Sequence, residues 1–131
     1  MKVLTIKEPF ATLIMNEIKH IETRSWKTNY RGEVYIQASI SKIKKEIYER
    51  KELVKLFENL DMHYGNIICK AYLKDCIYMD EDFIKSVNHQ EYVCGRYEVG
   101  RYAWILDNIE IIDPIRVKGK LGIWNYEGDI K

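Results

Sequence analysis

Segments with the two-residue period of a β-strand recur along this chain, and helical segments separate only some of them. The alternation is clearest in residues 34–38 and 67–74, where apolar side chains take every second position. Four further stretches are predicted strands: residues 3–6, 21–26, 102–112 and 115–124. Asp113-Pro114 is expected to form the turn between the last two. A doubly wound parallel sheet needs a helix after nearly every strand, so the pattern favours a small, closed or nearly closed β-barrel.

The helical period of 3.6 residues predicts two or three helices around this barrel. Pro9 fits the first turn of a helix, where its missing N–H costs nothing. A second helix is expected over residues 41–60, with Ser39 or Ser41 as its N-cap. Asp80 is a suitable N-cap for a third, short helix.

The composition is that of a single globular domain, which we predict to span residues 1–131. Of these residues, 47% are apolar and 31% are charged, which excludes general disorder. No apolar run approaches the roughly 18 residues of a membrane span, and the first residues lack the apolar core of a signal peptide. We therefore expect a cytoplasmic protein with no membrane partner. The cysteines, Cys69, Cys76 and Cys94, have no C-x-x-C spacing, so we expect no disulfide framework, metal or cofactor.

Charge is distributed unevenly along the chain. The net charge is only +1, but residues 1–60 have an excess of four basic residues and residues 61–131 an excess of three acidic ones. The basic excess is sharpest between Lys19 and Arg31, where Glu22 is the one acid among four bases. A local basic cluster on a nearly neutral protein indicates one anionic ligand site rather than overall electrostatic attraction.

Lys19, Glu22, Arg24 and Trp26 form the cluster with the clearest chemical potential. In an extended strand, Glu22, Arg24 and Trp26 project from one face, and Lys19 lies at the turn before it. Lys19 and Arg24 could clamp a phosphate, while Trp26 stacks on a base and Glu22 contacts a base edge. The alternative is an ion pair of Glu22 with Arg24 and a core tryptophan, and spacing alone favours it.

Two further basic positions are candidates for phosphate contacts. Arg31 precedes Gly32, whose missing side chain would allow a close approach of the backbone. Arg116, Lys118 and Lys120 share one face of the last predicted strand. This row fits either a track for a phosphate backbone or a solvated edge that resists aggregation.

The string from Glu17 to Arg24, E-I-K-H-I-E-T-R, resembles the signature of the ASCH domain, a PUA-like β-barrel family, written G-x-K-x-x-E-x-R. Lys19, Glu22 and Arg24 match the signature, and Glu17 stands where the family has glycine. Flanking segments are also similar to an ASCH subgroup: residues 6–11, 25–32, 100–104 and 119–124. On this resemblance, the chain is identified as one ASCH domain over residues 1–131.

The resemblance implies an α+β, mostly β fold: a PUA-like barrel of about five or six strands with two or three peripheral helices. It also implies a cleft lined by Lys19, Glu22 and Arg24 and a role connected with RNA. The candidate ligand-binding residues are Lys19, Glu22, Arg24, Trp26, Arg31, Arg101 and Lys118. We therefore predict a protein that binds RNA or a nucleotide. A sensor of a small anionic metabolite and a protein-interaction module are the alternatives.

An enzymatic role is a further alternative that the family implies. Some members resemble nucleases, and others resemble amidohydrolases that remove the acetyl group of a modified cytidine with a lysine, a threonine and a glutamate. Lys19 matches that lysine, whereas Glu22 stands where the threonine is found. In an enzyme, Lys19 and Glu22 would be the catalytic candidates of a metal-independent ribonuclease or amidohydrolase. We expect Lys19 to be partly exposed, so that Lys19→Ala reduces binding and leaves the fold intact.

Overall fold

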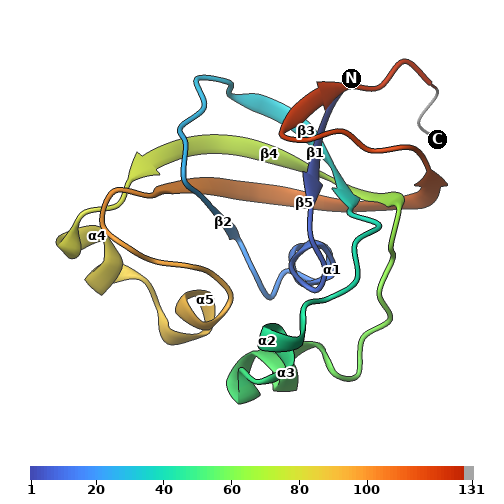
Figure 1. Ribbon diagram of the computed structural model, residues 1–131. Coiled ribbons are helices and arrows are strands. Elements are labelled where there is room, and N and C mark those ends of the chain that lie inside the picture. The colour runs from blue at the N-terminus through green and yellow to red at the C-terminus, as the bar shows by residue number, and fades with distance from the viewer. Residues whose placement is uncertain (129–131) are drawn as a thin grey trace.

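Six strands form one curled sheet in the computed structural model, which describes residues 1–128 (Figure 1). They are β1 (Lys2–Ile6), β2 (Ile21–Arg24), β3 (Gly32–Ala38), β4 (Asn66–Tyr78), β5 (Tyr102–Arg116) and β6 (Ile123–Asn125). The order across the sheet is β2-β5-β4-β3-β1-β6, and every pairing is antiparallel except that of β1 with β3. The sheet curls into a half-barrel, which confirms the predicted PUA-like class.

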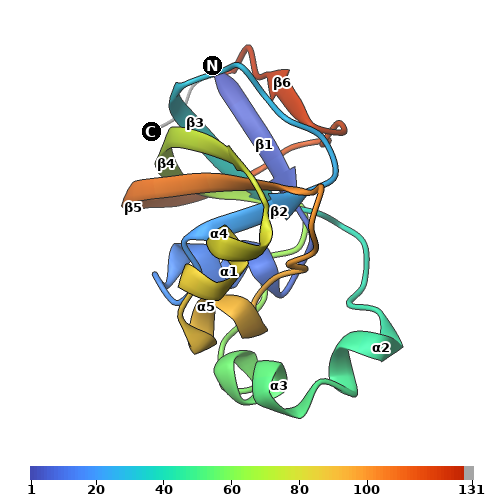
Figure 2. The ribbon, with the colours of Figure 1, turned by 90° about the vertical axis from the view of Figure 1, so that its left-hand side faces the viewer.

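Five short helices gather at one end of this sheet, opposite the N-terminus, in the part of the chain that the structure describes (Figures 1 and 2). They are α1 (Phe10–Met15), α2 (Lys45–Tyr48), α3 (Lys51–Phe57), α4 (Glu81–Ser86) and α5 (His89–Val93). The predicted number of two or three is too low because the helix expected over residues 41–60 is broken and α5 was not foreseen. None of the helices within residues 1–128 is long and apolar enough to cross a membrane.

The break between α2 and α3 lies at Arg50. Its backbone is not helical (φ −86°, ψ 87°), and its guanidinium donates to the Val93 carbonyl 2.6 Å away on α5. The predicted caps Ser39 and Ser41 are also wrong, since the N-cap of α2 is Lys44. The prediction for α4 is confirmed, because the Asp80 side chain accepts a hydrogen bond from the first turn of that helix.

The strand β5 continues through Pro114, so the predicted turn at Asp113-Pro114 is wrong. Between the pairs Ile67↔Ile115 and Cys69↔Ile111, β5 has two more residues than β4, and Pro114 lies in this irregularity. A proline, which cannot donate to the ladder, is tolerated at such a bulge. Arg116, Lys118 and Lys120 therefore do not share a strand face: Arg116 ends β5, and the two lysines lie in the loop before β6.

The main core fills the concave side of the sheet and includes Trp104 and the inward side chains of β1, β3 and β4. In β3, Val34, Ile36 and Ala38 are fully buried and Tyr35 is half-buried, as the alternation predicts. Gln37 is buried as well, at 2% exposure, although its alternating position predicts a more open side chain. Its amide donates to the carbonyls of Gly65, before β4, and Val117, after β5.

Candidate functional site

The segment that carries the candidate site begins at the C-terminal end of α1. The N–H of Glu17 donates to Ile14 (2.9 Å) and that of Ile18 to Leu13 (3.0 Å), which is the hydrogen-bond pattern of a Schellman motif. Glu17 has the left-handed φ of 57° that this motif requires at its position, which explains why glycine fits there. The motif reverses the chain and delivers Lys19 to the start of β2.

Lys19 is buried, with 1% of its surface exposed, so the expectation of a partly exposed lysine is wrong. Its ammonium donates to the carbonyls of Ile21 (2.5 Å) and Cys94 (2.7 Å) and lies 3.8 Å from Glu22 Oε1. The Phe10 ring packs 5.4 Å from the same nitrogen. A buried charge requires such partners, and Lys19 thereby ties β2 to the loop that follows α5.

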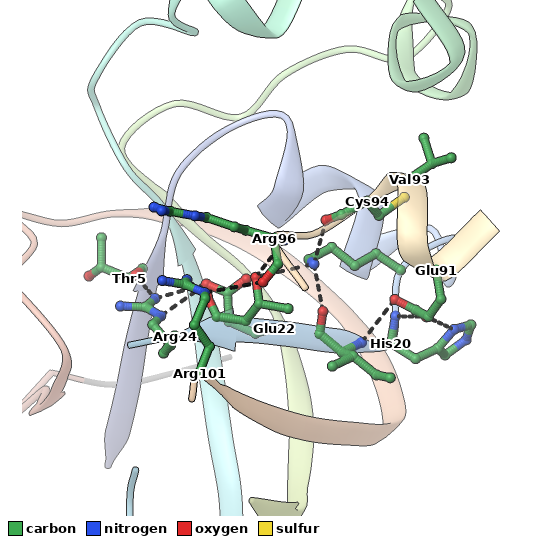
Figure 3. A network of polar contacts seen from close by, with 12 residues as sticks. Thr5, His20, Glu22, Arg24, Glu91, Val93, Cys94, Arg96 and Arg101 are labelled. Carbon is green, nitrogen blue, oxygen red and sulfur yellow. Dashed lines mark hydrogen bonds and ion pairs between the residues drawn. The ribbon is translucent and has the colours of Figure 1, made fainter. Parts of the chain in front are cut away.

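Arg24 lies at the other end of this polar network, beside Glu22 and Thr5 (Figure 3). Its guanidinium contacts Glu22 Oε2 through two nitrogens at 3.0 Å and donates to the Thr5 carbonyl of β1 at 2.9 Å. The rings of Trp26 and Trp104 lie 5.3 and 5.6 Å from the guanidinium carbon. The expected ion pair therefore exists. Trp26 is not a core tryptophan, since it is 50% exposed, whereas Trp104 beside it is buried.

A cavity of about 350 Å³ lies against Lys19, Glu22 and Arg24. Six cationic side chains line it, and Glu22 is the one carboxylate among its described lining residues. The cations are Lys7, Lys19, Arg24, Arg50, Arg96 and Arg101. Such an excess of positive charge in a recess favours an anionic ligand.

Arg96 and Arg101 differ in how firmly the protein holds them. Arg101 donates to the carbonyls of Thr23 (3.2 Å) and Arg96 (3.1 Å), and desolvation, with a smaller effect of the Arg96 charge, lowers the pKa of its guanidinium. The Arg96 side chain is exposed and pairs with Glu98 at 3.0 Å. Arg96 is therefore freer than Arg101 to turn to a ligand.

The structure brings together four of the seven predicted ligand-binding residues: Lys19, Glu22, Arg24 and Arg101 line the cavity. Trp26 lies next to Arg24 but outside the lining. Arg31 is also outside, where it donates to the carbonyls of its own loop and pairs weakly with Asp75 at 3.4 Å. Lys118 lies exposed in the loop before β6 and does not line the cavity.

Lys7, Arg50 and Arg96 are the lining cations that the sequence analysis did not select. Arg50 comes from the junction of α2 and α3, where a mixed run of charges resembles a solvated helix face. The sequence feature that could have pointed to Arg96 is the glycine before it, Gly95. A Cβ at Gly95 would come within 2.8 Å of the Tyr97 ring and 2.9 Å of Thr23. The close approach of this backbone to β2 therefore requires glycine at residue 95.

A curled mixed sheet with a cationic cavity beside the strand that follows the first helix defines a small PUA-like domain. The chain belongs to the ASCH domain family, whose model matches residues 4–119. This family is associated with RNA binding.

Curated relatives and solved structures agree with this assignment. Activating signal cointegrator 1 of Homo sapiens is 25% identical over 97% of this chain, and its Mus musculus counterpart is 24% identical over the same share. The chain spans only 22% of the length of these relatives. The crystal structure of ASCH from Zymomonas mobilis is 17% identical, with a TM-score of 0.58 over 96% of this chain and 87% of that one. At this identity, the likeness shows the fold alone.

Proposed function

We propose that this chain binds single-stranded RNA and that the cavity holds one of its nucleotides. The observation that carries the proposal is the convergence of six cationic side chains on a recess that contains a single carboxylate. Arg50 and Arg96, from outside β2, are suited to the phosphate. Glu22, whose Oε1 is 3.8 Å from the Lys19 nitrogen, is suited to accept a hydrogen bond from the amino group of a base.

Binding is favoured over hydrolysis by the contacts of Lys19. Its nitrogen donates hydrogen bonds to two carbonyl oxygens, an arrangement that suits an ammonium ion. A general base needs instead a lone pair directed at the substrate. Cys94 is no better as a nucleophile, since burial raises the pKa of its thiol.

Two matched arginine variants test the proposal. Arg96→Ala removes an exposed cavity cation whose side-chain hydrogen bonds within residues 1–128 all go to Glu98, and Arg31→Ala removes an exposed arginine outside the cavity. We expect Arg96→Ala to weaken binding of a fluorescent single-stranded RNA, measured by anisotropy. The slope of log affinity against log salt should fall by about 0.7, because one phosphate contact is lost. Arg31→Ala should leave both quantities unchanged.

Two results, one from this experiment and one from an activity assay, would refute the proposal. Equal losses in Arg96→Ala and Arg31→Ala would mean that RNA binds by general surface charge and not in the cavity. Release of acetate from acetylated cytidine by the wild-type chain, or cleavage of the RNA, would make the cavity an active site instead of a binding site.

A further inference from the structure

A second cavity, of about 490 Å³, adjoins the first. It is formed by the start of α3, by α5 and by the segment that follows α5. Arg50, Gly95 and Arg96 line both cavities. Arg50 and Arg96 therefore lie where the two cavities meet. At Gly95, which has no side chain, only backbone separates the two cavities.

An aromatic pair lines the second cavity. The rings of Tyr92 and Tyr97 stack with centroids 5.5 Å apart and planes inclined by 20°. Tyr97 is buried, with 7% of its surface exposed, whereas Tyr92 is 48% exposed. The buried ring therefore supports one face of Tyr92 and leaves the rest of that side chain accessible from solvent.

The hydroxyl of Tyr97 is not accessible from this cavity. It is buried and has no hydrogen-bond partner within residues 1–128. Burial, with a smaller effect of Glu91, raises the pKa of this phenol, so the group remains a donor. The second cavity therefore offers a ligand the exposed Tyr92 ring, and not this hydroxyl.

We infer that the second cavity binds the neighbouring nucleotide of the same RNA strand, with its base stacked on Tyr92 and the linking phosphate between Arg50 and Arg96. The inference rests on the proposed function. Stacking on an aromatic ring and a phosphate contact from an arginine are the two interactions that single-strand binding proteins combine. Because stacking accepts any base, the second cavity adds affinity rather than sequence specificity.

The test compares one nucleotide with two. Isothermal titration calorimetry would measure the dissociation constants of the four nucleoside 5′-monophosphates and of the matching 5′-phosphorylated dinucleotides. We expect at least one dinucleotide to bind about fivefold or more tightly than its mononucleotide. Tyr92→Leu should remove this advantage and leave mononucleotide affinity unchanged. Tyr78→Leu, which changes another exposed tyrosine outside both cavities, should preserve it.

Tyr97→Phe is a second, milder variant that removes only the unpartnered hydroxyl. Its stability should stay equal or rise, because no hydrogen bond within the chain is lost. Its dinucleotide advantage should persist, because the hydroxyl is inaccessible to a ligand and the ring that supports Tyr92 is kept. Equal affinities of mononucleotides and dinucleotides for the wild-type chain would overturn the second subsite and leave the first cavity in place. Failure of every mononucleotide and dinucleotide to bind would instead overturn the proposed function itself.

Discussion

Replacing Glu17 by glycine should stabilise this protein, although most substitutions destabilise. Glu17 is exposed, makes no ion pair within residues 1–128 and holds a φ of 57° in the Schellman motif that ends α1. The left-handed region brings the Cβ of an L-residue too close to the following carbonyl oxygen. Glycine removes this contact and keeps both backbone hydrogen bonds of the motif.

The expected gain is the difference between two opposing terms. Relief of the left-handed conformation is worth about 1–2 kcal/mol. The greater backbone entropy of glycine in the unfolded chain offsets about 0.5–1 kcal/mol of this stabilisation. The net increase in the free energy of unfolding is therefore about 0.5–1 kcal/mol, which for a chain of this length raises the melting temperature by about 2–4 °C.

Urea unfolding followed by tryptophan fluorescence would measure this change, with Glu58→Gly as the matched control. Glu58 is also an exposed glutamate at the end of a helix, but its φ of −60° is ordinary for any residue. Glu58→Gly should lower the unfolding free energy by about 0.5–1 kcal/mol, so the two variants should shift the midpoint in opposite directions. A midpoint for Glu17→Gly at or below that of the wild type would refute the reasoning.

Three further predictions concern buried groups. Lys19→Met should lower the free energy of unfolding by about 3 kcal/mol in urea titrations, because the carbonyls of Ile21 and Cys94 lose their donor. A loss below about 1 kcal/mol would contradict the buried position. Glu91→Gln should cost about 1–3 kcal/mol in the same assay, since the carboxylate accepts the N–H groups of His20 and Ile21. In the folded protein, a thiol reagent should react rapidly only with Cys76, which is half-buried. Cys69 and Cys94 are buried, and burial raises the pKa of the Cys69 thiol to about 12. All three should react after denaturation.

The fold was predictable where burial repeats along the sequence. Val34, Ile36 and Ala38 alternate because one face of β3 packs on the core, and that requirement is visible in the residues themselves. Pro114 was misread because a proline inside a strand depends on a bulge whose register is set by β4. The break at Arg50 likewise involves a partner 43 residues away, which no local period reveals.

The candidate site was predictable to the extent that it is contiguous in sequence. Lys19, Glu22 and Arg24 lie within six residues, so their spacing and the family signature identify them together. The burial of Lys19 depends on the carbonyl of Cys94, 75 residues further along the chain, and could not be foreseen. Arg96 reaches the same cavity through tertiary folding alone.

The contact of Arg24 with Thr5 has a consequence for how any variant of this arginine must be interpreted. The strands β2 and β1 are not neighbours in the sheet, and one guanidinium joins them across the open side of the half-barrel. Lysine cannot replace it, because a single ammonium lacks the planar fork that reaches a carboxylate and a carbonyl at once. Under the proposed function, Arg24 therefore has a structural role and a binding role at once. Loss of RNA binding in an Arg24 variant would therefore combine two effects, the separation of β2 from β1 and the loss of a ligand contact. Variants of the exposed cavity residues have to be measured first, before those of the buried ones.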